Sequence, residues 1–231
     1  MAKKKTEQGD KSLSGIEQAL TRSERFIENN QKLLINILTG VLAVVLLVIL
    51  GNRYYLKPQN QEAASNMYMA ERFFERDSFN LALNGYGSYP GFLEIIDEYG
   101  ITSSARLARY YAGICYKELG NYEEAIDYLK RYNTNDLLVG AASKSSLGDA
   151  YAELGQYDKA TKAYLDGAER YENDFSTPVI LKKAGIVYEE MGELEKALEV
   201  YKRIQTNYPE SAEGREIKKY IGRVEAKLAS V

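Results

Sequence analysis

Three stretches of equal length are sufficient to predict the architecture of this 231-residue chain: RYYAGICYKELGNYEEAIDYL at 109–129, KSSLGDAYAELGQYDKATKAY at 144–164 and LKKAGIVYEEMGELEKALEVY at 181–201. In each stretch a Gly, a Tyr or Leu, a second Gly and an Ala stand at matching offsets. The second Gly recurs after 35 and then 37 residues. A period of this length is typical of arrays of helical hairpins, in which each unit buries its apolar face against its neighbours.

Each shared position has a mechanical reason. The first Gly lacks a side chain where the two helices of a hairpin are expected to cross closely. The second Gly is expected at the end of the first helix, where a left-handed backbone is needed. The Ala lets the second helix lie against the first, and Tyr side chains fill the wedge between helices, which explains the 20 Tyr residues. The first Gly is residue Gly113, Gly148 or Gly185 in the three stretches. The second Gly is Gly120, Gly155 or Gly192, and the Ala is Ala125, Ala160 or Ala197.

This pattern resembles that of the tetratricopeptide repeat (TPR) family, although the Trp sometimes found at its fourth position is missing from all three stretches. A degenerate earlier copy is predicted at 69–86, with its second helix extended or broken by the tract GYGSYPG at 85–91. After the last repeat, Pro209 precedes a helix with one apolar stripe, as in the capping helix of a solenoid. The resemblance implies an all-α TPR solenoid of about four helical hairpins at 53–210 and a capping helix at 211–231.

A run of twenty uncharged residues, LLINILTGVLAVVLLVILGN at 33–52, precedes the repeats. As a helix it would be about 30 Å long, which matches the hydrocarbon thickness of a bilayer. The tract RYY at 53–55 follows as an interface belt, and KP at 57–58 is predicted to stop the helix. A buried core helix and a cleaved signal peptide are the alternatives, but the run is long and no cleavage site or lipidated Cys follows it. The sequence therefore predicts a single N-terminal transmembrane helix.

The charges on either side of this run predict its orientation. Seven Lys and Arg residues precede it, whereas the short stretch after it offers only Arg53 and Lys57. This bias predicts a cytoplasmic N-terminus and a translocated C-terminal part. Within the tail at 1–32, residues 12–30 combine a capping box, SGIE at 14–17, with helical spacing of apolar residues. They are interpreted either as a helix that lies on the membrane or a partner, or as a moderately amphipathic lead into the span.

The composition argues against most kinds of catalysis. His is absent, which removes the commonest general base and metal ligand, and the single Cys115 cannot form an internal disulfide or a zinc site. Lys and Arg number 30 against 33 Asp and Glu, so no basic nucleic-acid-binding face is expected. No phosphate-binding loop, nucleophile motif or metal-ligand spacing is found. We therefore expect a protein that is not an enzyme, with no cofactor, no metal and no nucleic-acid partner.

The TPR resemblance also implies a partner-binding groove, lined by the first helix of each hairpin. The family's groove positions fall on twelve residues, and the carboxylate clamp of some TPR proteins is absent because Tyr110, Ile114, Ser145 and Asp149 occupy its places. The mixed lining suits an extended or helical protein segment. The alternative is that these positions only pack or face solvent. The twelve residues are Leu107, Tyr110, Ile114, Lys117, Ala142, Ser145, Asp149, Ala152, Val179, Lys182, Ile186 and Glu189.

The order of tail, span and TPR domain resembles a bacterial family, the ancillary TPR subunit of the SecYEG translocon (YfgM-like), which joins a membrane-anchored periplasmic prolyl isomerase. This resemblance implies an inner-membrane protein whose periplasmic TPR domain holds or hands over newly translocated envelope proteins.

Two other classes remain open from the sequence. One is an anchored scaffold of a different envelope machine, such as outer-membrane assembly, secretion or cell division. The other is a eukaryotic organelle receptor with a cytosolic TPR domain, which would require the opposite exposure. An enzyme ranks last.

Overall fold

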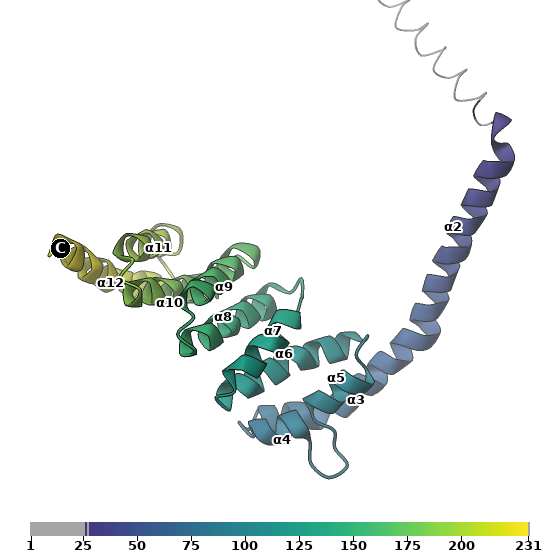
Figure 1. The fold of residues 1–231 in the computed structure, drawn as a ribbon, viewed down its shortest axis with the longest axis horizontal. Helices are drawn as coiled ribbons and strands as arrows, with labels where there is room; N and C mark the ends of the chain where they lie inside the picture. The colour runs from purple at the N-terminus through teal and green to yellow at the C-terminus, as the bar shows by residue number, and fades with distance from the viewer. Residues whose placement is uncertain (1–25, 27, 231) are drawn as a thin grey trace, which may run out of the picture. The chain divides into compact units, whose positions relative to one another are not determined.

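The computed structural model describes residues 26 and 28–230, and these are helical over most of their length (Figure 1). The chain divides into two units between Lys57 and Pro58. The N-terminal unit contains α2 and the π-helical turn η1, and the C-terminal unit is built from α3 to α12. The amphipathic helix predicted at 12–30 lies almost entirely outside the described residues. The elements are α2 (Gln31–Gly51), η1 (Asn52–Leu56), α3 (Lys57–Phe74), α4 (Phe79–Asn84), α5 (Phe92–Glu98), α6 (Ser103–Glu118), α7 (Tyr122–Arg131), α8 (Leu137–Glu153), α9 (Tyr157–Arg170), α10 (Thr177–Glu190), α11 (Leu194–Asn207) and α12 (Ala212–Ala229).

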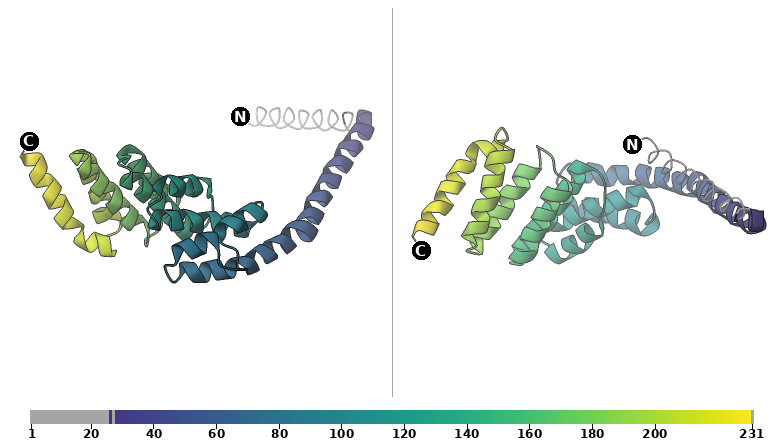
Figure 2. Two further views of the ribbon diagram at one scale, coloured as in Figure 1. Left: turned by 60° about the horizontal axis from the view of Figure 1, so that its bottom comes forward. Right: turned by 90° about the horizontal axis from the view of Figure 1, so that it is seen from above.

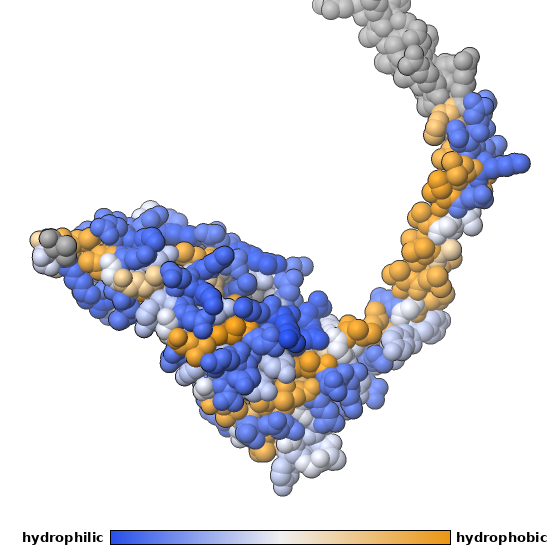
Figure 3. All heavy atoms as spheres, viewed as in Figure 1, coloured by the Kyte–Doolittle hydropathy of each residue, from blue (hydrophilic) through white to orange (hydrophobic). Residues whose placement is uncertain are grey.

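Helix α2 contains all of the predicted membrane span except Asn52, and none of the residues of α2 is buried (Figure 3). Among the described residues, one helix has the length and apolar composition needed to cross a membrane. The prediction that Lys57-Pro58 stops this helix is wrong, because helical backbone continues through η1 into α3. Pro58 therefore lies inside a continuous helix, where it has no N–H to donate to the preceding turn. The wider π-helical turn just before it absorbs the interruption.

Three hairpins follow the repeat pattern: α6 with α7, α8 with α9 and α10 with α11 (Figure 2). In each, the backbone turns at the predicted glycine with a positive φ, between 67° and 79°. At Gly120 the turn is closed by two hydrogen bonds, from Gly120 N to Lys117 O at 3.0 Å and from Asn121 N to Tyr116 O at 2.9 Å. This Schellman arrangement satisfies carbonyl groups at the end of the first helix. The left-handed turn predicted from the sequence is confirmed.

The first Gly of each repeat lies where a side chain of the second helix crosses the first. A Cβ atom on Gly148 would stand 2.4 Å from the Tyr164 ring, and one on Gly185 would stand 2.2 Å from the Tyr201 ring. Tyr164 and Tyr201 are 3% and 0% exposed. The prediction that these glycines permit a close crossing is therefore confirmed, and the crossing group is the Tyr at a matching offset in the second and third repeats and Leu129 in the first.

The first hairpin has a broken second helix, as the tract at 85–91 predicts. Helix α3 turns at Asp77, whose φ of 55° places a non-glycine residue where the later repeats have Gly. The return path is split into α4 and α5 by a short β-bridge between Tyr86 and Tyr89. Two apolar cores run through the stack, one beneath α3 to α6 and the other from α6 to α12. Cys115 belongs to the first of these cores and is fully buried.

Candidate protein-binding face

The first helices of the hairpins lie in a row. Helices α6, α8 and α10 contact one another in order, and α10 contacts α12 in the same way. Each pair is joined through an antiparallel second helix, so these first helices run in the same direction. We call the surface formed by the twelve predicted groove positions, together with the adjoining side of α12, the first-helix face. The row gives this face the continuity that a bound segment needs.

The twelve positions differ in accessibility. Val179 and Ile186 are exposed, at 36% and 37%, whereas Ile114 is buried at 9% and packs in the core. The remaining nine are half-buried: Leu107, Tyr110, Lys117, Ala142, Ser145, Asp149, Ala152, Lys182 and Glu189. A partner on this face would therefore meet Val179 and Ile186 most directly.

Asp149 joins three successive hairpins. Its carboxylate accepts hydrogen bonds from Lys183 Nζ on α10, at 2.8 and 2.7 Å, and from the Tyr164 hydroxyl on α9, at 2.7 Å. Lys117 Nζ on α6 lies 4.0 Å away, and Lys183 also donates to Ser145 Oγ at 3.1 Å. The side chain of Asp149 is only 24% exposed. Because its oxygens already have donors within the chain, Asp149 stabilises the row of helices.

Glu189 has the same role at the C-terminal end of the row. Its side chain is 5% exposed, and it accepts hydrogen bonds from the Tyr201 hydroxyl at 2.9 Å, from Arg223, and from Lys227 Nζ at 3.0 Å. Burial by itself raises the pKa of this carboxyl, but the hydrogen bonds from Arg223, Lys227 and Tyr201 outweigh burial and lower the pKa. The carboxylate is therefore held ionised and ties α12 to the last hairpin.

Two pockets open beside this row. One, of about 370 Å³, is lined by Ile186, Glu189 and Glu190 of α10 and by three residues of α12: Tyr220, Arg223 and Lys227. Tyr220 lies beneath the Arg223 guanidinium, 4.9 Å from its ring centroid, in a cation–π arrangement. Exposed Ile186 thus borders a strongly polar wall, which gives this end of the face a mixed apolar and charged character.

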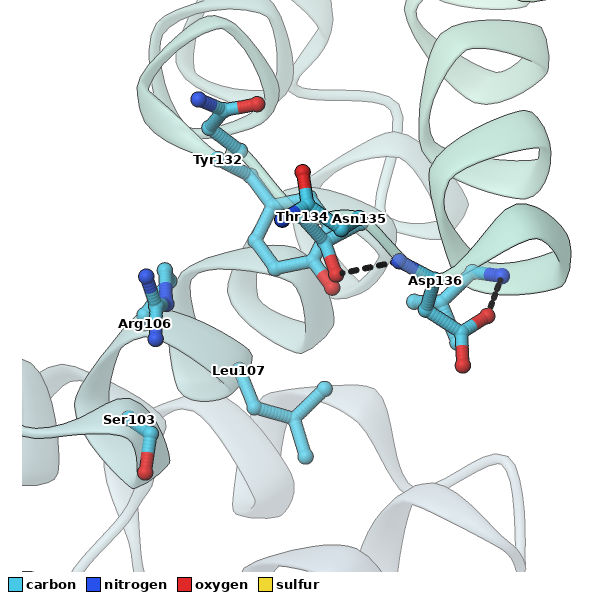
Figure 4. A pocket seen from close by; sticks show the side chains of 9 residues that line it. Ser103, Arg106, Leu107, Tyr132, Thr134, Asn135 and Asp136 are labelled. Carbon is cyan, nitrogen blue, oxygen red and sulfur yellow. Dashed lines mark hydrogen bonds between the residues drawn. The ribbon is translucent and has the colours of Figure 1, made fainter. Parts of the chain in front are cut away.

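The other pocket, of about 490 Å³, lies between the start of α6 and the loop that leads into α8 (Figure 4). Leu107, Ser103 and Arg106 come from α6, and Tyr132 with the tract at 133–136 comes from the loop. Asp136 Oδ1 accepts hydrogen bonds from the backbone N–H groups of the first turn of α8, both at 2.9 Å. This carboxylate is therefore used as a helix cap, and the exposed Arg106 supplies the cationic side of the pocket.

Sequence reasoning missed several residues of the face. Lys183 pairs with Asp149, whereas the register of the family predicted only its neighbour Lys182, which faces Glu213 at 3.6 Å. Arg223 and Lys227 were assigned to a capping helix, and nothing in the repeat pattern links them to Glu189. The spacing of i and i+4 basic residues on α12 was the one signal that could have found them, because such residues share one face of a helix. Among the described residues, no group of three His, Cys, Asp or Glu side chains comes together as a metal site.

Comparison with known proteins places this fold among TPR-like domains. Residues 62–217, more than half of the chain, match the family described as "T7SS, ESX-1 secretion system protein EccA1, N-terminal domain". No curated protein matches the chain.

Solved structures with the same fold include TPR-like repeats of a kinesin light chain from Podosopora anserina, at 14% identity and a TM-score of 0.55, covering 74% of this chain and 88% of that one. A crystal structure of the MamA protein gives 18% identity and a TM-score of 0.53, covering 71% and 88%. The predicted all-α TPR-like solenoid is confirmed, and the matching family differs from the translocon subunit that the layout resembles.

Proposed function

The chain belongs to the family of the EccA1 N-terminal domain, and on this premise we propose that it is a membrane-anchored, non-enzymatic protein-binding scaffold of a secretion machine. The matching family takes its name from a component of a type VII secretion system. This supports the interpretation as an anchored scaffold of an envelope machine other than the Sec translocon. Helix α2 would be the anchor, because its apolar side chains are exposed and need a hydrophobic environment. The seven Lys and Arg residues before the run support a cytoplasmic N-terminus.

The observation that carries the proposal is the first-helix face itself. Its charged positions, Asp149 and Glu189 above all, are already satisfied by donors from neighbouring helices. Its exposed apolar positions, Val179 and Ile186, by contrast, remain accessible to a partner. A protein segment that supplies apolar and neutral polar side chains fits this lining better than a charged peptide does. TPR-type solenoids bind partners along such extended surfaces.

The test is affinity purification of the full-length chain in mild detergent, with mass spectrometry of what it retains. The test variant is Val179→Glu with Ile186→Glu, which puts charges on the exposed apolar positions of the face. The matched control is Leu119→Glu with Tyr157→Glu, since these side chains are exposed to the same degree, at 39% and 38%, but lie off the face. A subunit of a secretion machine should be retained by the wild type and the control and lost from the test variant. Equal retention by both variants would rule out the first-helix face as the binding surface.

A role beside the Sec translocon is the second candidate, supported by the layout of a basic N-terminal tail, a span and a TPR domain. In that case the same purification would retain translocon subunits or a periplasmic prolyl isomerase, and translocated clients would occupy the face. The two candidates therefore differ in the identity of the retained proteins.

A further inference from the structure

The most exposed apolar side chains of the C-terminal unit, Tyr apart, lie in or directly beside the loops that join one hairpin to the next. In Pro58–Ser230, four large apolar side chains other than Tyr are more than half exposed: Ile101 at 68%, Leu137 at 51%, Leu138 at 55% and Phe175 at 80%. Ile101 lies in the α5–α6 loop, the two Leu residues start α8, and Phe175 lies in the α9–α10 loop. We call these three segments, 99–103, 132–138 and 171–176, the loop edge. Exposed apolar groups gathered in this way are typical of an interaction surface.

The segments of the loop edge are neighbours in space. The Tyr171 hydroxyl donates a hydrogen bond to Thr134 O at 3.0 Å, and Arg170 donates to Asn133 Oδ1 at 3.0 Å. These two bonds hold the α9–α10 loop against the α7–α8 loop. The pocket of about 490 Å³ in Figure 4 joins the α7–α8 loop to the start of α6. The apolar residues therefore line one continuous edge of the solenoid.

The same edge holds the beginning of α3. Asn60 Oδ1 accepts hydrogen bonds from Ser103 Oγ at 2.8 Å and from Ser104 N at 2.9 Å. Asn60 follows the last residue of the apolar run, Asn52, by eight residues. At most about 3.6 Å per residue, eight residues keep Asn60, and with it the Ser103 end of the loop edge, within about 29 Å of the end of the run. If α2 spans a bilayer, chain length alone keeps the Ser103 end of the loop edge within reach of the bilayer surface, and the other two segments follow it along the same edge.

We propose that the loop edge docks on the surface of the membrane that anchors the chain, with Ile101, Leu138 and Phe175 inserted among the lipid headgroups and upper acyl chains. Apolar and aromatic side chains gain free energy at this depth because they leave water without crossing the bilayer. The exposed Arg106 in the neighbouring pocket is placed to meet a lipid phosphate. This proposal rests on the anchoring role of α2 in the proposed function.

The absence of Trp makes the test direct, since a single introduced Trp reports its own environment. The full chain is reconstituted in vesicles of phosphatidylcholine and phosphatidylglycerol, with acyl chains either plain or brominated. The reporters are Ile101→Trp, Leu138→Trp and Phe175→Trp, each made separately. Blue-shifted emission that brominated lipid quenches is the expected result at all three.

Two matched reporters test whether an introduced Trp binds lipid by itself, wherever it stands on the surface. Tyr86→Trp replaces another exposed aromatic, at 65%, that packs on Phe73 at the far end of α3, thirteen residues or about 20 Å of helix from Asn60. Ile186→Trp lies on the first-helix face. Emission from both should resemble that of a water-exposed Trp and should not be quenched. Quenching at Tyr86→Trp as strong as at the loop edge would overturn the proposal.

A reporter within α2 separates failure of the docking from failure of the anchor. Leu42→Trp should be quenched by brominated lipid if α2 spans the bilayer. Quenching of Leu42→Trp without quenching at the loop edge overturns the docking alone, and assigns the exposed apolar side chains to a protein contact. No quenching at Leu42→Trp overturns the anchor, and the docking with it.

Discussion

Substitution of one buried glycine by alanine tests the way in which the hairpins pack. A Cβ atom on Gly148 would lie 2.4 and 2.5 Å from two ring carbons of Tyr164, far inside the normal contact distance of about 3.5–4.0 Å. The ring cannot move aside easily, because Tyr164 is 3% exposed and its hydroxyl is held by Asp149 at 2.7 Å. Gly148→Ala must therefore distort the crossing of α8 and α9.

The magnitude follows from two opposing effects. Overpacking of a well-packed core costs about 1–3 kcal/mol, and the rigid ring places this site near the upper end. Alanine also favours a helix over glycine by about 1 kcal/mol. We expect Gly148→Ala to lower the free energy of unfolding by about 2 kcal/mol. The matched control is Gly222→Ala in α12, where no heavy atom lies within 4 Å, and which should raise it by up to about 1 kcal/mol.

The assay is urea unfolding of the full chain in mild detergent, followed by far-ultraviolet circular dichroism. Combining Gly148→Ala with Tyr164→Ala tests the cause, because without the ring the added methyl group has space. In the Tyr164→Ala background, Gly148→Ala should be neutral or stabilising. A stable Gly148→Ala variant, or a penalty that persists after the ring is removed, would refute the proposed packing.

Three further outcomes are expected. Asp149→Asn weakens the charge-assisted bond from Lys183 while keeping that from Tyr164, so it should lower the free energy of unfolding by about 1 kcal/mol; an unchanged urea midpoint would contradict this. The pKa of Glu189 is lower in the folded state than in the unfolded state. The stabilisation from its carboxylate is therefore present above the unfolded pKa of about 4.3 and is lost as the pH falls through the folded pKa. Thermal unfolding measured against pH should show a smaller loss of stability at acid pH in Glu189→Gln than in the wild type. Burial raises the pKa of the Cys115 thiol to about 12, so Ellman's reagent should react with it only after denaturant is added.

Much of the fold was predictable from local pattern. The glycines at 120, 155 and 192 were expected to be left-handed, and their φ values of 79°, 67° and 75° confirm this. The predicted break at 85–91 also forms, because Gly85 and Gly87 adopt positive φ, which no right-handed helix accommodates. The continuation of helix through Pro58 was not predicted. A proline inside a helix disturbs the turn before it, and here that turn widens into a π-helix at 52–56, in which Lys57 N–H bonds to Asn52 O.

The binding face was only partly predictable. The repeat register named twelve positions on the first helices, and the structure shows which of them are exposed, Val179 and Ile186. It did not indicate that Lys183 would pair with Asp149 of the preceding hairpin, or that α12 would supply the partners of Glu189. Such pairs join residues 34 or more positions apart, so no local spacing encodes them.

Helices, turn residues and the apolar run follow from short-range rules, because backbone preference and hydropathy act within a few residues of each other. The stacking of successive hairpins decides which charges are paired, which apolar side chains remain exposed and which loops meet along one edge. The geometry of each hairpin is set by contacts such as that of Tyr164 on Gly148, which form only when the helices pack. The repeat pattern therefore specifies the units, and the packing between them specifies the surfaces with which this protein can bind.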